Sequence, residues 1–267
     1  MRTIDGFRHS WLEAGDGEAV VVIHGIGSHA RAFEAQAKAL SERYTLFVWN
    51  LPGYGETEAF AQHRPTEYDY GDKLHAFLDG NFVERAHFVG HSLGAIVICA
   101  MLSSWRGRAL SFTLLQPVRG FAHLDEARRA DVQNSRVEEL SNLGMVAFSR
   151  RRGPAVLGPE ATPAMVRSHL AFMMQIPEAA YLQAWGMMCR TDLFKLVDVV
   201  SCPVQIICGG EDKVSAPAMC RDLACLLPCA EFTILPGVGH SAAIESPDRL
   251  AAELAAFIDH SAKDANR

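Results

Sequence analysis

Short runs of consecutive apolar residues alternate along the chain with longer segments that have the periodicity of helices. The apolar runs predict strands at residues 19–23, 44–49, 86–89, 110–116, 204–208 and 231–235. Helical patterns follow most of them, at residues 30–41, 68–78, 93–105, 217–227 and 247–260. Fully apolar runs are typical of parallel strands that are covered on both faces, so we predict an α/β fold with a mostly parallel, doubly wound sheet.

The segment from residue 119 to residue 195 interrupts this alternation. It contains helical patterns, many methionines and a run of three arginines, Arg150 to Arg152, but no convincing strand. Strand patterns resume after it. We therefore predict a single α/β core formed by residues 1–118 and 196–267, with residues 119–195 inserted as a helical segment.

Composition narrows the choice of compartment and partners. A net charge of −6 argues against a nucleic-acid partner. The apolar run at residues 93–102 is too short to span a bilayer, and MRTIDGFRHSW lacks the apolar core of a secretory signal, so we expect no membrane association. The seven cysteines form no CxxC pair and have no histidines at metal-ligand spacing, which predicts a reduced, cytoplasmic protein without a bound metal. The sequence leaves a monomer and a homodimer open.

The pattern G-H-S-L-G at residues 90–94 carries the first chemical signal. It places Ser92 between a predicted strand and a long apolar helix. This arrangement is typical of a nucleophile elbow, a sharp turn that lifts a serine above the sheet. Gly90 and Gly94 leave room where the backbones approach each other, and the start of the helix offers unpaired N–H groups. We predict that Ser92 is a nucleophile.

A serine hydroxyl needs a base, and the base needs an acid that orients it. Glu211 and Asp212 follow the strand at 204–208, and His240 follows the strand at 231–235. The carboxyl ends of parallel strands meet at one edge of the sheet, where open α/β sheets bind their ligands. The order serine, acid, histidine is the one found on this kind of scaffold. We predict His240 as the base and Asp212, in preference to Glu211, as the acid.

Two main-chain N–H groups are expected to bind the oxyanion of the reaction. The loop HGIG follows the strand at 19–23 directly, and Gly25 and Gly27 allow its backbone to come close to a substrate. We predict the amides of Ile26 and of Leu93, the residue after the nucleophile, as the two donors. We expect His24 to support this loop through hydrogen bonds.

Taken together, five motifs resemble the α/β-hydrolase fold superfamily, in the order that the family shows them: HGIG (24–27), NLPGYGET (50–57), GHSLGA (90–95), GGEDKVSAP (209–217) and GVGHSAAIESPDRL (237–250). The resemblance implies the roles given above for Ser92, Asp212 and His240, and it implies that residues 119–195 form a helical cap. One departure is Asn50, where the family usually has aspartate. That position normally structures a loop, so we expect no effect on the chemistry.

The layout is similar to 3-oxoadipate enol-lactonases and small carboxylesterases. This similarity implies hydrolysis of an ester, lactone or related acyl bond in a small catabolic compound, through an acyl-enzyme and without a cofactor. The sequence leaves open whether the compound carries a carboxylate or is neutral, and amides stay open too. We expect Arg119 and His123, where the chain crosses from sheet to cap, and Arg150 to contact this small-molecule substrate.

Alternatives on the same scaffold stay open. Hydrolases that cut C–C bonds in products of aromatic ring cleavage are similar too, but they usually have tryptophan after the histidine, where this chain has Ser241. Some relatives with this fold are hormone receptors that close the cap on a ligand, and others catalyse cofactor-independent oxygenation or perhydrolysis. We favour C–O bond hydrolysis.

Overall fold

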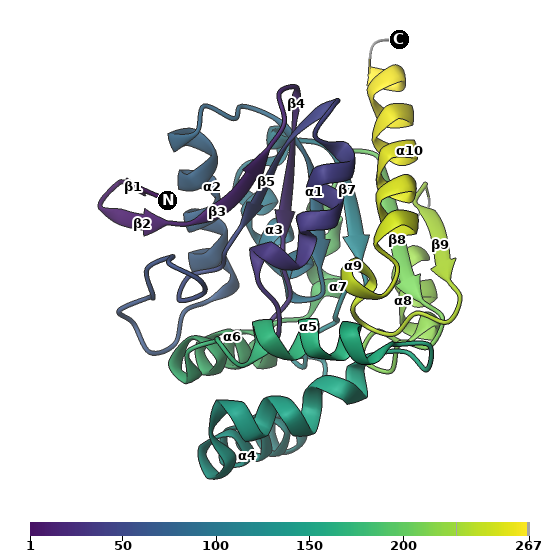
Figure 1. The fold of residues 1–267 in the computed structure, drawn as a ribbon. Coiled ribbons are helices and arrows are strands. Elements are labelled where there is room, and N and C mark those ends of the chain that lie inside the picture. Colours follow the sequence, from purple (N-terminus) through teal and green to yellow (C-terminus); the bar gives the residue numbers. More distant parts are fainter. Residues whose placement is uncertain (228, 266–267) are drawn as a thin grey trace.

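A seven-stranded sheet organises the chain in the computed structural model, which describes residues 1–227 and 229–265 (Figure 1). Its strands lie in the order β3-β5-β4-β6-β7-β8-β9, and only β3 runs antiparallel to its neighbour. Their bounds are β3 (Trp11–Ala14), β4 (Glu18–Ile23), β5 (Tyr44–Trp49), β6 (Ala86–His91), β7 (Ala109–Leu115), β8 (Val204–Gly209) and β9 (Glu231–Leu235). A separate hairpin joins β1 (Arg2–Ile4) to β2 (Phe7–His9). The predicted α/β class with a mostly parallel sheet is confirmed.

Helices cover both faces of the sheet and create two apolar cores. On one face lie α1 (Glu34–Leu40), preceded by the 3₁₀ turn Ala30–Phe33, together with α9 (Ala242–Glu245) and α10 (Pro247–Ala265). On the other face lie α2 (Glu67–Gly80), α3 (Leu93–Ser104) and α8 (Pro217–Ala224). Residues 20–23 of β4 alternate between the two cores and are almost completely buried, which explains why the strand is apolar at every one of these positions.

The chain between β7 and β8 forms helices, with no strand in that interval, all of whose residues the structure describes. The elements are α4 (Glu126–Arg152), the 3₁₀ turn Gly153–Val156, α5 (Pro163–Met173), α6 (Glu178–Arg190), α7 (Leu193–Leu196) and the 3₁₀ turn Val197–Val199. Gly144, with φ of 67°, divides α4 into two helical parts. Helices α4, α5 and α6 lie together beyond the carboxyl ends of the parallel strands (Figure 1). We use the name cap for residues 119–195.

The turn between β6 and α3 consists of Ser92 alone, because β6 ends at His91 and α3 begins at Leu93. The helix starts so close to the sheet that a Cβ on Gly94 would lie 2.2 Å from the carbonyl oxygen of Ile23 in β4. Only glycine fits at that position. The turn is therefore fixed by packing against the central strand.

Every helix in residues 1–227 and 229–265 is too short or too polar to cross a bilayer.

Candidate active site

Ser92 has a backbone conformation that residues with a side chain rarely adopt, with φ of 55° and ψ of −116°. Strand β7 helps to hold Ser92 in this conformation, since the main-chain N–H of Ser92 donates to the carbonyl of Leu115 at 2.9 Å. The side chain is almost fully buried and lines a cavity. The backbone conformation of Ser92 therefore places its hydroxyl at the edge of this cavity.

The imidazole of His240 lies between Ser92 and Asp212. Its Nε2 is 3.0 Å from Ser92 Oγ, and its Nδ1 is 2.7 Å from Asp212 Oδ2. A carboxylate can only accept at Nδ1, so the proton is on Nδ1 and the lone pair of Nε2 faces the hydroxyl. The structure thus brings together three side chains that lie on three separate loops at the carboxyl edge of the sheet.

Asp212 is buried but stays ionised. Burial by itself would raise its pKa, but the imidazole of His240 and the hydrogen bonds from His240 and from the N–H groups of Ser215 and Val214 outweigh burial and hold the pKa below its usual value. Both N–H groups donate to Oδ1 at 2.8 Å. One oxygen is therefore held by the backbone, and the other is left for the histidine.

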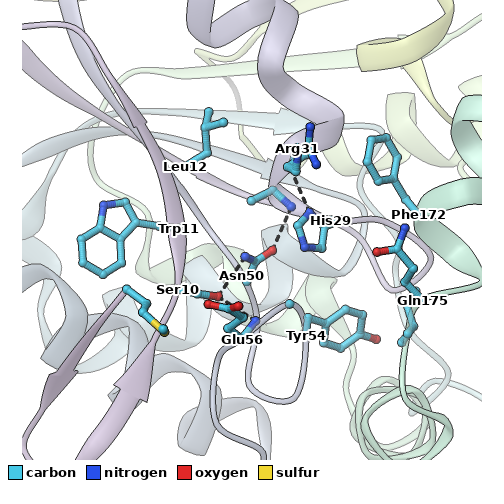
Figure 2. A pocket seen from close by; sticks show the side chains of 14 residues that line it. Ser10, Trp11, Leu12, His29, Arg31, Asn50, Tyr54, Glu56, Phe172 and Gln175 are labelled. Atoms are coloured by element: carbon cyan, nitrogen blue, oxygen red, sulfur yellow. Dashed lines mark hydrogen bonds between the residues drawn. The ribbon is translucent and has the colours of Figure 1, made fainter.

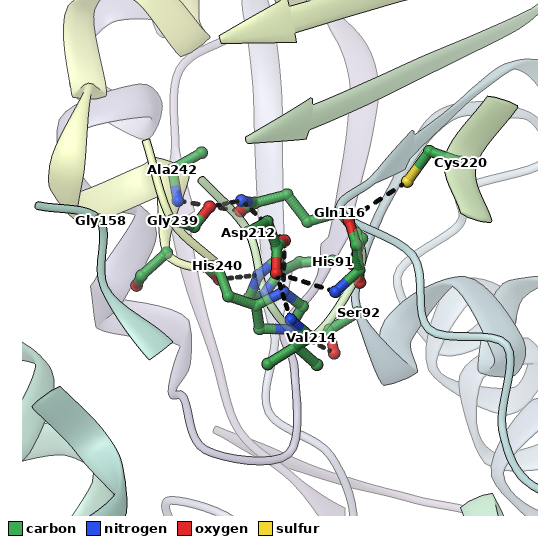
Figure 3. Close-up of polar contacts among 12 residues, drawn as sticks. His91, Ser92, Gln116, Gly158, Asp212, Val214, Cys220, Gly239, His240 and Ala242 are labelled. Carbon is green, nitrogen blue, oxygen red and sulfur yellow. Dashed lines mark hydrogen bonds and ion pairs between the residues drawn. The ribbon is translucent and has the colours of Figure 1, made fainter. Parts of the chain in front are cut away.

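Gln116 joins the loop that contains Asp212 to the loop that contains His240 (Figure 3). The sequence patterns did not predict this role for Gln116. Its side-chain N–H donates to Asp212 Oδ2 at 3.3 Å and to the carbonyl of Gly239, and its Oε1 accepts from the N–H of Ala242 at 2.9 Å. Its backbone is left-handed, with φ of 46°, and its carbonyl accepts from the hydroxyl of Ser215 at 2.9 Å. A glutamine at the carboxyl end of the strand predicted at 110–116 was the only signal in the sequence.

Glu245 holds the main chain on both sides of His240. Its carboxylate accepts from the N–H groups of Gly239 and Ser241, each at 2.9 Å, and from the N–H of Gly158 in the cap at 2.6 Å. Three donors compensate a partly buried charge. The carboxylate of Glu245 therefore links the loop that contains His240 to the cap.

His91, the residue before Ser92, supports the main chain of His240. Its Nε2 donates to the carbonyl of His240 at 3.0 Å, and its Nδ1 has no partner among the residues that the structure describes. Burial, together with the nearby His240, lowers the pKa of His91 to about 3. The imidazole is therefore neutral in ordinary buffers.

The HGIG loop packs directly against the elbow. A Cβ on Gly25 would lie 3.0 Å from Ser92 Cβ, which accounts for glycine at this position. His24 accepts from the N–H of Leu51 at 3.2 Å and donates to the carbonyl of Gly25 at 2.8 Å, and the hydroxyl of Tyr54 donates to the carbonyl of Ile26 at 3.0 Å. Hydrogen bonds to the carbonyls of Gly25 and Ile26 therefore hold the loop around the N–H of Ile26, the predicted oxyanion donor.

The N–H groups of Ile26 and Leu93 have no acceptor within residues 1–227 and 229–265. Ile26 also lines the cavity, and Leu93 follows Ser92 at the first position of α3. Two unpaired N–H groups beside one serine are a place where an oxyanion can bind.

A cavity of about 570 Å³ lies between this site and the cap. Arg119 and His123 line it, as does His169 from α5, whose pKa burial and the nearby His240 lower to about 4. Arg150 is exposed and does not line the cavity. Two other cap arginines do, and sequence reasoning named neither as a substrate contact: Arg136 and Arg152.

A second cavity, of about 500 Å³, lies between β3, the loop after β5 and the end of α5 (Figure 2). Its polar groups bond to one another. Asn50 accepts from the N–H of Ala30 at 2.9 Å and donates to the hydroxyl of Ser10 at 3.0 Å, and His29 accepts from the N–H of Arg31 at 3.1 Å. These bonds give Asn50 the loop-structuring role expected from the sequence. The cavity that contains Ser92 and His240 is the better candidate for an active site.

Comparison with known proteins agrees with this architecture. Residues 20–253 match the model of the alpha/beta hydrolase family. RutD of Escherichia coli O44:H18, a protein named for carbamate hydrolysis, is 25% identical over 244 residues, which cover 87% of each chain.

Two solved structures share the fold over nearly their whole length. An esterase from Thermogutta terrifontis superposes with a TM-score of 0.84 at 22% identity, covering 96% of this chain and 94% of the other. The enol-lactonase of Burkholderia xenovorans LB400 has a TM-score of 0.83 at 19% identity, covering 96% and 98%.

Proposed function

Because the chain belongs to the alpha/beta hydrolase family, we propose that it is a serine hydrolase that cleaves an ester, a lactone or a related acyl bond of a small molecule through an acyl-enzyme. The observation that carries the proposal is the continuous hydrogen-bonded line from Asp212 through His240 to Ser92, at 2.7 and 3.0 Å. The similarity to RutD adds carbamates to the acyl bonds to be tested.

In the first half of the reaction, Ser92 Oγ attacks the carbonyl carbon while His240 Nε2 takes its proton. Asp212 stabilises the imidazolium that forms. The same imidazolium then gives its proton to the leaving group, and an ester remains on Ser92. In the second half, His240 takes a proton from the water that attacks this ester, and it gives the proton to Ser92 Oγ as the bond from Oγ to the acyl carbon breaks and the acid is released.

The negative charge of each tetrahedral intermediate is placed against the N–H groups of Ile26 and Leu93. Because these donors have no other acceptor among the described residues, they need no rearrangement to bind an oxyanion. One such donor stabilises the transition state by about 3 kcal/mol in enzymes where it has been removed. The mostly apolar lining, which includes Val118, Phe121 and Met188, keeps the effective dielectric low.

The test is turnover of p-nitrophenyl esters, of an aryl lactone and of a p-nitrophenyl carbamate by the wild-type protein and by Ser92→Ala. We expect multiple turnovers of at least one substrate, and a loss of roughly four orders of magnitude or more in kcat for Ser92→Ala. Turnover that survives in this variant would reject serine catalysis. A single slow turnover with a large thermal shift would instead support a ligand receptor.

A further inference from the structure

Arg136 is a cap residue whose side chain faces the catalytic cavity. It lies on α4 and is half-buried. Its guanidinium carbon lies 4.2 Å from the centroid of the Trp185 ring, and its Nη1 donates to the hydroxyl oxygen of Tyr181 at 2.6 Å. All three residues line the cavity that contains Ser92. Two aromatic side chains from α6 therefore fix the position of this cation.

Arg136 has no ion-pair partner among the described residues, since the nearby carboxylate of Glu139 pairs with Arg151 and Arg152 instead. The other two arginines of the cavity have carboxylate partners: Arg119 with Asp192 at 2.9 and 3.2 Å, and Arg152 with Glu139 at 2.7 Å. Within the described part of the chain, no carboxylate lies within 4.0 Å of the Arg136 guanidinium, and its Nε and Nη2 donate no hydrogen bond. The Nε–H and one N–H of Nη2 are therefore available side by side on one planar edge.

The surroundings of Arg136 hold two further donors without an acceptor among the described residues. Trp185 Nε1 is buried without an acceptor among the described residues. The hydroxyl oxygen of Tyr181 accepts from Arg136, and no described residue accepts the proton of that hydroxyl. A buried donor without an acceptor costs free energy, so this part of the cavity is incomplete without an acceptor from outside the chain.

We propose that Arg136, held by Trp185 and Tyr181, binds a carboxylate of the substrate while Ser92 attacks an acyl carbon at the other end. The inference rests on the proposed function. A planar guanidinium with a free edge matches a carboxylate in a two-bond arrangement. One arginine without an ion-pair partner, in a cavity whose other two arginines have carboxylate partners, fits a single negative charge. The substrate class is a small monoanionic ester or lactone, such as the half-ester of a dicarboxylic acid.

A pair of chromogenic esters of equal chain length tests the proposal: mono-p-nitrophenyl adipate, which is anionic, and p-nitrophenyl hexanoate, which is neutral. For R136Q we expect kcat/KM to fall about 10- to 100-fold for the anionic ester, the range of a lost charged hydrogen bond, and to change less than about threefold for the neutral one. Equal effects on both esters, or none, would overturn the proposal.

The matched control is R150Q, which removes an arginine of the same helix that is exposed and lies outside the cavity. Both esters should respond within about twofold, because a distant exposed charge is screened by solvent. If R136Q fails to fold, R136K replaces it. The lysine keeps the charge and loses the planar edge, so only the anionic ester should be affected.

Calorimetric binding of monomethyl adipate, a half-ester with one negative charge, to the S92A protein separates this inference from the proposed function. Monomethyl adipate should bind to S92A, and at least about tenfold more weakly to the S92A/R136Q double variant. If the wild type hydrolyses no ester, the proposed function fails, and this binding result alone decides the role of Arg136. If esters are cleaved but monomethyl adipate binds both variants equally, the carboxylate site fails and the hydrolase stands.

Discussion

The main-chain N–H of His240 donates a hydrogen bond of 2.7 Å to the carbonyl of Val156, which lies in the cap. Two residues further along, Gly158 donates to the carboxylate of Glu245, which also holds the residues on both sides of His240. The segment between α4 and α5 is therefore part of the support of His240, the proposed base. Changes at Gly158, which does not line the cavity, should therefore affect catalysis without touching the substrate.

Gly158→Ala should destabilise the protein, because a Cβ at this position would lie 2.3 Å from the carbonyl oxygen of Gly237. We expect a loss of about 1–3 kcal/mol in the free energy of unfolding, the usual cost of overpacking, and a lower kcat since the clash lies in the histidine loop. Urea unfolding and p-nitrophenyl ester kinetics measure the two effects. The control is Gly107→Ala, where a Cβ meets no atom within 4 Å. An equal response of both variants would contradict this account.

Glu245→Gln should lower kcat about tenfold and reduce stability by about 2 kcal/mol. An amide has one acceptor oxygen for three N–H donors, and its own N–H₂ would face one of them. KM should change little, since Glu245 does not line the cavity. Glu253→Gln is the matched control, because its carboxylate makes only a long 3.9 Å surface pair with Arg249. A kcat as high as that of the control would mean that the loop does not need this carboxylate.

Gln116→Glu should shift activity towards higher pH. The variant places a second carboxylate beside Asp212 Oδ2, which the amide now contacts at 3.3 Å. Like charges disfavour each other's ionised form, so the pKa of Asp212 should rise above its present lowered value. Activity needs ionised Asp212, so the acidic limb of kcat/KM should begin at higher pH. An unchanged limb in a folded variant would show that Gln116 does not act through Asp212.

Stability should fall as the solution is acidified below about pH 6.5. Burial lowers the pKa of His24 and of His91 to about 3 each. An unfolded histidine binds its proton near pH 6.5, so between these values the unfolded chain binds more protons than the folded chain. The stabilisation from the neutral imidazoles is complete above this range and is lost as pH decreases, by up to about 1.4 kcal/mol per pH unit for each group.

Urea unfolding at several pH values between about 7.5 and 4.5 measures this slope. The comparison variant is His91→Gln, which cannot titrate and keeps an N–H for the carbonyl of His240. Its slope should be shallower than that of the wild type. The same slope in both proteins would argue that His91 is already protonated when folded.

The central strands were predictable because burial on both faces requires apolar residues at consecutive positions. The predicted strands agree with β4 to β9 within about two residues at each end. The amino-terminal strands were missed, although Asp5-Gly6 between Ile4 and Phe7 is a hairpin signal: both turn residues have positive φ, 49° and 74°. Those strands are short and expose polar side chains, so no apolar run marks them.

The helix expected at residues 30–41 was predicted with the right position but the wrong first turn. His29 caps it by accepting from the N–H of Arg31, and the chain forms a 3₁₀ turn before α1 begins at Glu34. The break in α4 was not predicted either. Gly144 alone, without a proline, gave no indication that its φ would be positive.

The three residues at the strand ends could be expected to meet, because parallel strands deliver their carboxyl ends to one edge. The group around Arg136 could not. Its members come from α4 and α6, and Tyr181 lies 45 positions further along the chain. How two cap helices cross depends on packing, which local sequence patterns do not specify. For the same reason Arg150 was favoured over Arg136, although both lie on α4.

The close contact between Gly158 of the cap and Gly239, next to His240, limits which cap segments can be exchanged in this protein. Gly158 and Gly239 lie so close that a methyl group on Gly239 would sit 2.3 Å from the nitrogen of Gly158. A chimera that imports the lid of a relative to change selectivity must therefore keep Val156 to Gly158 from this chain. Grafts joined at residues 119 and 195 without that stretch would replace the cap but lose two hydrogen bonds. One joins the N–H of His240 to the carbonyl of Val156, and the other joins the N–H of Gly158 to the carboxylate of Glu245.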